Sequence, residues 1–102
     1  MNNSIFVLTI AEEPIQDFYE NQLPLLEIKA TFKYFIRKKI FVEKFNLLIW
    51  GDLCNDIIKY YRKDDCIIVE GYLTISSELN TNNLKNMEKK IELTVMNIYP
   101  FF

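Results

Sequence analysis

The sequence predicts a mainly β domain in which five strands close into a small barrel, with one helix between the third and fourth strands. Five segments are rich in β-branched and aromatic residues. One stretch between the third and fourth of them has the apolar spacing of a helix. The 102 residues suit a single domain spanning 1–102, and since half of them are hydrophobic, it can bury a core without disulfides or a metal.

Strands are expected over residues 4–11, 25–35, 41–50, 66–75 and 90–100. Pro14 ends the first segment, because proline cannot donate a hydrogen bond to a neighbouring strand. The stretches 15–24 and 36–40 are polar and basic, respectively, and both are expected to form turns. The Asn-rich stretch 76–90 predicts a mobile connection between the last two strands.

The first strand is apolar on both faces. Phe6, Leu8 and Ile10 share one face, because successive side chains of a strand point to opposite sides. Ile5 and Val7 share the other face. A strand with two apolar faces is either sandwiched or lies at a subunit contact.

Each later strand has one face that is expected to point inward. These faces carry Leu26, Ile28, Ala30 and Phe32, then Phe45, Leu47 and Ile49, then Ile67, Val69, Gly71, Leu73 and Ile75, and finally Ile91, Leu93 and Val95. The mid-strand Gly71 predicts a sharp bend or a close backbone approach, as at a barrel corner. Trp50 lies in the opposite phase to Phe45, Leu47 and Ile49 and is therefore expected to point outward.

A short helix of about three turns is expected after Trp50. Its apolar positions follow the i, i+3, i+4 spacing of one buried face, and they are Leu53, Cys54, Ile57, Ile58 and Tyr61. Asp52 can cap the first turn through its side-chain oxygen, and Gly51 frees the turn before it. The resulting order β-β-β-α-β-β is that of the OB-fold, a small partly open barrel whose helix plugs one end.

Composition excludes several classes of function. A net charge of −2 and a pI of about 5.1 argue against a broadly basic surface. Two cysteines without any histidine make a zinc site implausible, and Cys54 and Cys66 are expected to be reduced core residues. No apolar run approaches the roughly 20 residues that span a bilayer, so no membrane contact is expected.

The sequence also contains no recognisable arrangement of catalytic residues. The chain has no histidine, no serine or cysteine with an activating base at a recognisable spacing, and no phosphate-binding glycine-rich loop. We therefore expect no catalytic residue, no cofactor, no metal and no small-molecule substrate.

The segment LLIWGDLCNDIIKYYRKDDCIIVEGYL, residues 47–73, resembles the most typical part of bacterial single-stranded-DNA-binding proteins. The opening NSIFVLTIAEEP and the ending IELTVMNIYPF resemble the same family. The length and the AT-biased composition are similar to a plastid-encoded branch, which implies the chloroplast stroma as location. The resemblance also implies an OB barrel that binds single strands and forms a dimer or tetramer through its first strand, with Ile5 and Val7 at the contact.

Single-strand binding needs aromatic faces for stacking and cations for phosphates. Trp50 stands where the family places an aromatic residue that faces the nucleic acid, and we expect it to share an open groove with the basic hairpin between the second and third strands. The candidate residues are Trp50, Tyr72 and Tyr34 for bases, with Lys33, Arg37, Lys38, Lys39 and Lys44 for phosphates. The competing interpretation is that Trp50 packs under the hairpin or at a subunit contact.

Some positions depart from the family pattern. Asp52 replaces a usual lysine, and Thr74, Ser76 and Glu78 stand where arginine and a distant aromatic residue are common. Two functions therefore stay open from the sequence. One is non-catalytic binding of single strands, DNA more than RNA, and the other is an OB-fold protein-interaction module that has lost most affinity for nucleic acid.

Overall fold

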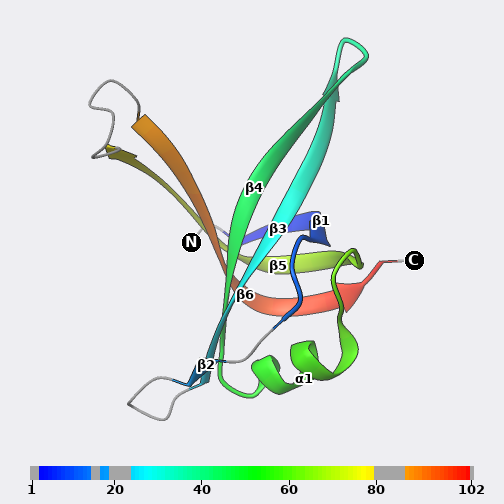
Figure 1. Cartoon of the computed structure of the whole chain (residues 1–102), viewed down its shortest axis with the longest axis vertical. Coiled ribbons are helices and arrows are strands. Elements are labelled where there is room, and N and C mark those ends of the chain that lie inside the picture. Colours follow the sequence, from blue (N-terminus) through cyan, green and yellow to red (C-terminus); the bar gives the residue numbers. More distant parts are fainter. Residues whose placement is uncertain (1–2, 15–16, 19–23, 80–86, 102) are drawn as a thin grey trace.

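The computed structural model describes residues 3–14, 17–18, 24–79 and 87–101 (Figure 1). The elements within these residues are β1 (Asn3–Ile10), β2 (Asp17–Phe18), β3 (Pro24–Ile36), β4 (Lys39–Trp50), α1 (Leu53–Tyr60), β5 (Cys66–Leu79) and β6 (Met87–Pro100). The five long strands and the helix between β4 and β5 have the predicted order. The two-residue strand β2, inside the expected turn 15–24, is an addition to it.

The strands form one closed sheet. Their order is β1-β5-β6-β4-β3-β2, and a further pairing of β1 with β3 at Thr9↔Thr31 and Ile10↔Ala30 closes the barrel. β4 and β6 run parallel, with Leu47 opposite Leu93, and the other pairs are antiparallel. This closed five-strand barrel confirms the predicted OB-fold.

The inward faces are those that the alternation predicts, with one exception. The buried side chains are Leu8, Ile10, Leu26, Ile28, Ala30, Phe45, Leu47, Ile49, Cys54, Ile57, Tyr61, Ile67, Val69, Ile91, Leu93 and Val95. Phe6, Phe32 and Leu73 are partly buried against this core. Ile75 was expected inside but is 56% exposed, because β5 and β6 continue beyond the closed part of the barrel as a two-stranded ribbon (Figure 1).

That ribbon corrects the prediction for 76–90. β5 extends to Leu79 and β6 begins at Met87, with polar pairs such as Ser76↔Lys90 in register. The expected mobile connection is therefore paired strand at both of its ends, because backbone hydrogen bonds hold a ribbon whatever its polar side chains are. Its central residues 80–86 lie outside the described part of the chain.

The helix begins differently from the prediction. Gly51 has φ +74°, as expected for the turn into α1. Asp52, however, has helical backbone angles and makes no side-chain capping hydrogen bond, so the expected carboxylate cap is wrong. The Asp52 carbonyl instead accepts the N–H of Asn55 at 3.1 Å. α1 has eight residues, about two turns rather than three.

Gly71 marks an irregularity between β5 and β6. The register shifts between Glu70, which pairs with Asn97, and Gly71, which pairs with Val95. A Cβ at Gly71 would collide with the carbonyl group of Thr94, whose carbon would lie 2.9 Å away. The close backbone approach predicted for this glycine is confirmed. In the described part of the chain, no helix has the length and apolar character to cross a membrane.

Candidate nucleic-acid interface

Trp50 points out of the barrel, as the alternation predicts. Along β4, Lys44, Asn46, Leu48 and Trp50 occupy the outer face, while the residues between them fill the core. Trp50 is the last residue of β4, pairs with Leu25 of β3, and is 52% exposed. Its indole therefore presents a free aromatic surface.

The strand register places Tyr72 on the same outer face. Tyr72 of β5 is opposite Thr94 of β6, and Thr94 is opposite Leu48 of β4. Two strand spacings of about 4.8 Å thus separate Tyr72 from Leu48, which stands two residues before Trp50. Tyr72 is half-buried, so it offers less free ring surface than Trp50 does.

Tyr34 lies on the opposite face of its hairpin from Lys33. Its ring stacks between Phe32 at 5.8 Å and Phe41 at 5.3 Å, with interplanar angles of 23° and 17°. Phe32 in turn packs on Phe6 and Phe45 at the edge of the core. Tyr34 therefore continues the core's aromatic cluster into the hairpin and does not join Trp50.

The basic hairpin and Trp50 lie at opposite ends of the molecule. Arg37 and Lys38 form the two-residue turn between β3 and β4, with φ of 50° and 67°. Lys39 is the first residue of β4 and Trp50 the last, so about 36 Å of strand separates them. The turn and α1, near the end of β4, lie at the two ends of the long axis (Figure 1). The expected shared groove is not formed.

Lys44 instead belongs to a cluster that the sequence analysis missed. Four lysines from β3, β4 and β6 line one pocket of about 550 Å³, and we call them the lysine pocket: Lys29, Lys44, Lys89 and Lys90. Lys89 and Lys90 fall in the stretch that was expected to be a mobile connection. Lys29 and Lys44 share the outward phase of the β3–β4 hairpin and stand two register pairs apart, and this was the available signal.

The charges of the lysine pocket are partly compensated. Lys89 forms an ion pair with Glu43 at 3.7 Å, and Lys90 forms one with Glu92 at 3.8 Å. Neither Lys29 nor Lys44 takes part in an ion pair among the residues that the structure describes. Both are exposed, so these two ammonium groups are the ones most available to an anion, although the Glu12 carboxylate, which accepts the Lys29 backbone N–H at 3.2 Å, also lines the pocket.

Comparison with known proteins decides the family. A protein of Trieres chinensis, provisionally named as the single-stranded DNA-binding protein ycf41, is 35% identical over 102 residues, covering 99% of this chain and 89% of that protein. The thylakoid-associated single-stranded DNA-binding protein slr1034 of Synechocystis is 32% identical over 99 residues, covering 96% and 74%. The chain belongs to this family of single-stranded DNA-binding proteins.

Solved structures agree with the fold of this single-stranded DNA-binding family. The crystal structure of a Synechococcus single-stranded DNA-binding domain matches with a TM-score of 0.70 at 23% identity, covering 97% of this chain and 94% of that one. A small single-stranded DNA-binding protein from Streptomyces coelicolor matches with a TM-score of 0.72 at 13% identity, covering 98% and 94%. No protein-family model matches the chain.

In this single-stranded DNA-binding family member, β1 has a partly open edge. Residues 3–9 pair with β5 on one side, whereas pairing with β3 on the other side is confined to Thr9 and Ile10. Ile5 is 65% exposed and Val7 is 42% exposed on the outer face of this strand. Of the two possibilities left open for an apolar outer face, sandwiching by the described residues of the same chain is excluded.

Proposed function

We propose that the chain binds single-stranded DNA, without catalysing a reaction, on the outer face of β3, β4, β6 and β5. The observation that carries this proposal is the exposed indole of Trp50 on the same face as Tyr72 and as three lysines of the lysine pocket, Lys29, Lys44 and Lys90. Stacking of one base on an aromatic ring contributes about 1–3 kcal/mol and tolerates any sequence. The strand would therefore bind without strong base preference.

The lysine pocket would hold phosphates about 20 Å from Trp50, the length of six β4 residues. A binding path that runs from the indole to the pocket fits within the roughly 4–16 nucleotides that one OB-fold covers. The hairpin cations Lys33, Arg37, Lys38 and Lys39 would extend the attraction to phosphates beyond the pocket. Tyr34 would join them only where a base reaches the inner face of the hairpin.

Trp50 gives a direct test, because it is the chain's one tryptophan. Its fluorescence should be quenched on titration with oligothymidine at low salt, and less with matched oligouridine. An unchanged signal together with an unshifted band in a gel would contradict the proposal. Stronger quenching by the RNA oligomer would reassign the ligand to RNA.

We propose further that the open edge of β1 pairs with β1 of a second copy. Ile5 and Val7 support this, since they are apolar, exposed and adjacent to unpaired backbone groups of the same edge. A two-fold contact of this kind is self-complementary and gives a dimer. Sedimentation velocity at micromolar concentration would measure it.

The relatives support a plastid location, one of them being named as thylakoid-associated. Within the plastid we place the chain in the stroma, where fractionation of chloroplasts should recover it.

The alternative function is that of a protein-interaction module. One observation favours it, which is that Glu92 lies beside the lysine pocket on the proposed binding face. A partner captured from plastid extract after nuclease treatment, without binding of oligothymidine, would favour it.

A further inference from the structure

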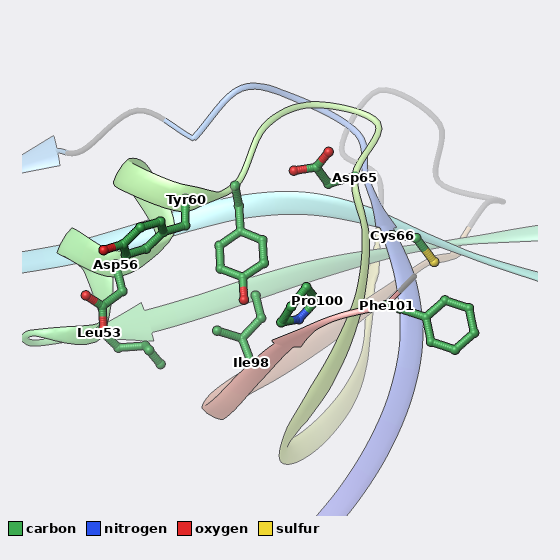
Figure 2. A pocket seen from close by; sticks show the side chains of 9 residues that line it. Leu53, Asp56, Tyr60, Asp65, Cys66, Ile98, Pro100 and Phe101 are labelled. Carbon is green, nitrogen blue, oxygen red and sulfur yellow. The ribbon is translucent and has the colours of Figure 1, made fainter.

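A second pocket of about 650 Å³ lies away from the proposed DNA-binding face. It is bounded by α1, by the loop that enters β5 and by the end of β6 (Figure 2). We call it the acidic groove, and its lining includes Asp56, Tyr60, Tyr61, Asp65, Ile98 and Phe101. Its walls are thus aromatic and aliphatic, and the charged side chains that line it are carboxylates.

The negative charges of both carboxylates affect the ionisation of Tyr61, which lines the groove. Burial raises the pKa of the Tyr61 hydroxyl, and the negative charges of Asp56 and Asp65 raise it further. Asp65 also accepts the Arg62 backbone N–H at 2.8 Å. The Arg62 guanidinium is bound to the carbonyls of Ile58 and Tyr61, so it does not line the groove. The groove therefore suits a cation that carries apolar surface.

A segment of that chemistry exists in the same chain. The arm, which we define as residues 33–42 of the β3–β4 hairpin, extends beyond the barrel (Figure 1). It exposes five large apolar side chains, which are Phe35, Ile36, Ile40, Phe41 and Val42. Arg37 and Lys38 are exposed at its tip. Contiguous apolar side chains exposed on this scale mark an interaction site.

The arm cannot fill the groove of its own chain, because its tip and α1 lie at opposite ends of the molecule (Figure 1). We propose that the arm tip of one copy docks into the acidic groove of a second copy. Arg37 and Lys38 would meet Asp56 and Asp65, while apolar side chains of the tip would cover the aromatic walls. An arginine suits this site, since its planar guanidinium binds carboxylates and stacks on aromatic rings.

The arm–groove contact joins two different surfaces, whereas the β1 contact joins two identical edges, so the two contacts give different assemblies. Each copy offers an arm to one neighbour and a groove to another, and such a heterologous contact builds open chains of copies. The proposal does not depend on the DNA-binding proposal, because neither Asp56 nor the groove belongs to the outer face of β3, β4, β6 and β5. In the absence of nucleic acid, the arm tip would bind the groove of a neighbouring copy.

The test is sedimentation velocity of the full chain without nucleic acid. The wild-type mean mass should rise with concentration past that of a dimer. Asp56→Lys and the double variant Arg37→Asp/Lys38→Asp should each stop at the dimer. An equimolar mixture of the two variants should grow past the dimer again, because the unchanged basic arm of Asp56→Lys then meets the unchanged acidic groove of the arm variant. Asn55→Lys, on α1 outside the groove lining, is the matched control and should behave as wild type.

Growth of either charge variant as in wild type would overturn the proposal, as would a wild type that stops at the dimer. A mixture that stays dimeric would overturn it too. Asp56→Asn is a second groove variant in case Asp56→Lys misfolds, because it removes the negative charge without adding a bulky cation. Its mean mass should also stop rising at the dimer. If the mean mass stops rising in Asp56→Lys but rises normally in the arm variant, another basic segment fills the groove. That result also overturns the proposal. Asp56→Lys should still quench with short oligothymidine as wild type does, so failure of DNA binding is recorded separately.

Discussion

Trp50 combines high exposure with a fixed position at the end of a paired strand. Trp50→Ala should lower affinity for oligothymidine about 5- to 150-fold, which corresponds to the roughly 1–3 kcal/mol of one stacked base. Anisotropy of a labelled oligomer measures this without the tryptophan signal. Trp50→Phe should recover part of the affinity. Tyr60→Ala, which removes an exposed ring on α1, should bind as wild type, and equal affinity of Trp50→Ala and wild type would contradict the stacking role.

Gly71 and Gly51 are both required, but for different physical reasons. Gly71→Ala should reduce the free energy of unfolding by about 3 kcal/mol, because the new Cβ meets the backbone of Thr94 and the bulge must shift. Gly51→Ala should cost only about 1 kcal/mol, since its positive φ is strained for alanine but no atom lies within 4 Å. Urea unfolding of both variants gives the comparison, and a larger loss at Gly51 would contradict it.

Cys54 gives the barrel a dependence on alkaline pH. Burial raises the pKa of its thiol above the usual 9.0, because leaving water disfavours the thiolate. The stabilisation is complete below the unfolded thiol's pKa and is lost as pH rises through the folded value. The free energy of unfolding should therefore fall as the pH rises above the unfolded thiol's pKa of about 8.5, and fall less in Cys54→Ala. A parallel decline in both proteins would show that other groups, such as Tyr61, cause it.

At the scale of elements, strand phase was predictable and strand length was not. Two-residue alternation correctly assigned the inward residues of β1, β3, β4 and β6, because a register error would expose an entire face. The start of β5 at Cys66 and the end of β6 at Pro100 were predicted correctly. The last residues of β5 and the first residues of β6 could not be found this way, since pairs such as Ser76↔Lys90 are polar and bury little. The start of α1 was misjudged for a similar reason. Asp52 is a common capping residue, and only the backbone angles show that it is already helical.

The lysine pocket is an element-level prediction because three strands contribute to it. Lys29→Ala and Lys44→Ala should each weaken oligothymidine binding, and each should reduce the slope of log K against log salt by about 0.7 per lost phosphate contact. Binding measured at several salt concentrations gives this slope. Lys59→Ala on α1, whose ammonium lies over the Tyr60 ring, should leave the slope unchanged. An unchanged slope in both pocket variants would remove phosphates from this site.

At the scale of the whole molecule, the candidate site depends on barrel closure. The outward direction of Trp50 could be predicted from its own strand. The lysine pocket could not, because Lys29, Lys44 and Lys89 come together only through the β3–β4 hairpin and the parallel pairing of β4 with β6. The expected groove between Trp50 and the basic hairpin is not formed because Lys39 and Trp50 are the first and last residues of one extended strand, eleven positions apart.

Assembly through β1 would let two binding faces act on one DNA strand. Val7→Lys should shift the dimer toward monomer while leaving the barrel folded, because the side chain is exposed in the single chain and a charge would oppose pairing of the two edges. Sedimentation at low micromolar concentration measures the shift, and urea unfolding checks the fold. Since a second linked contact raises affinity without any new type of interaction, wild type should bind long oligothymidine much more tightly than short oligomers. Val7→Lys should lose most of this length dependence, and a variant that stays dimeric would contradict the β1 contact.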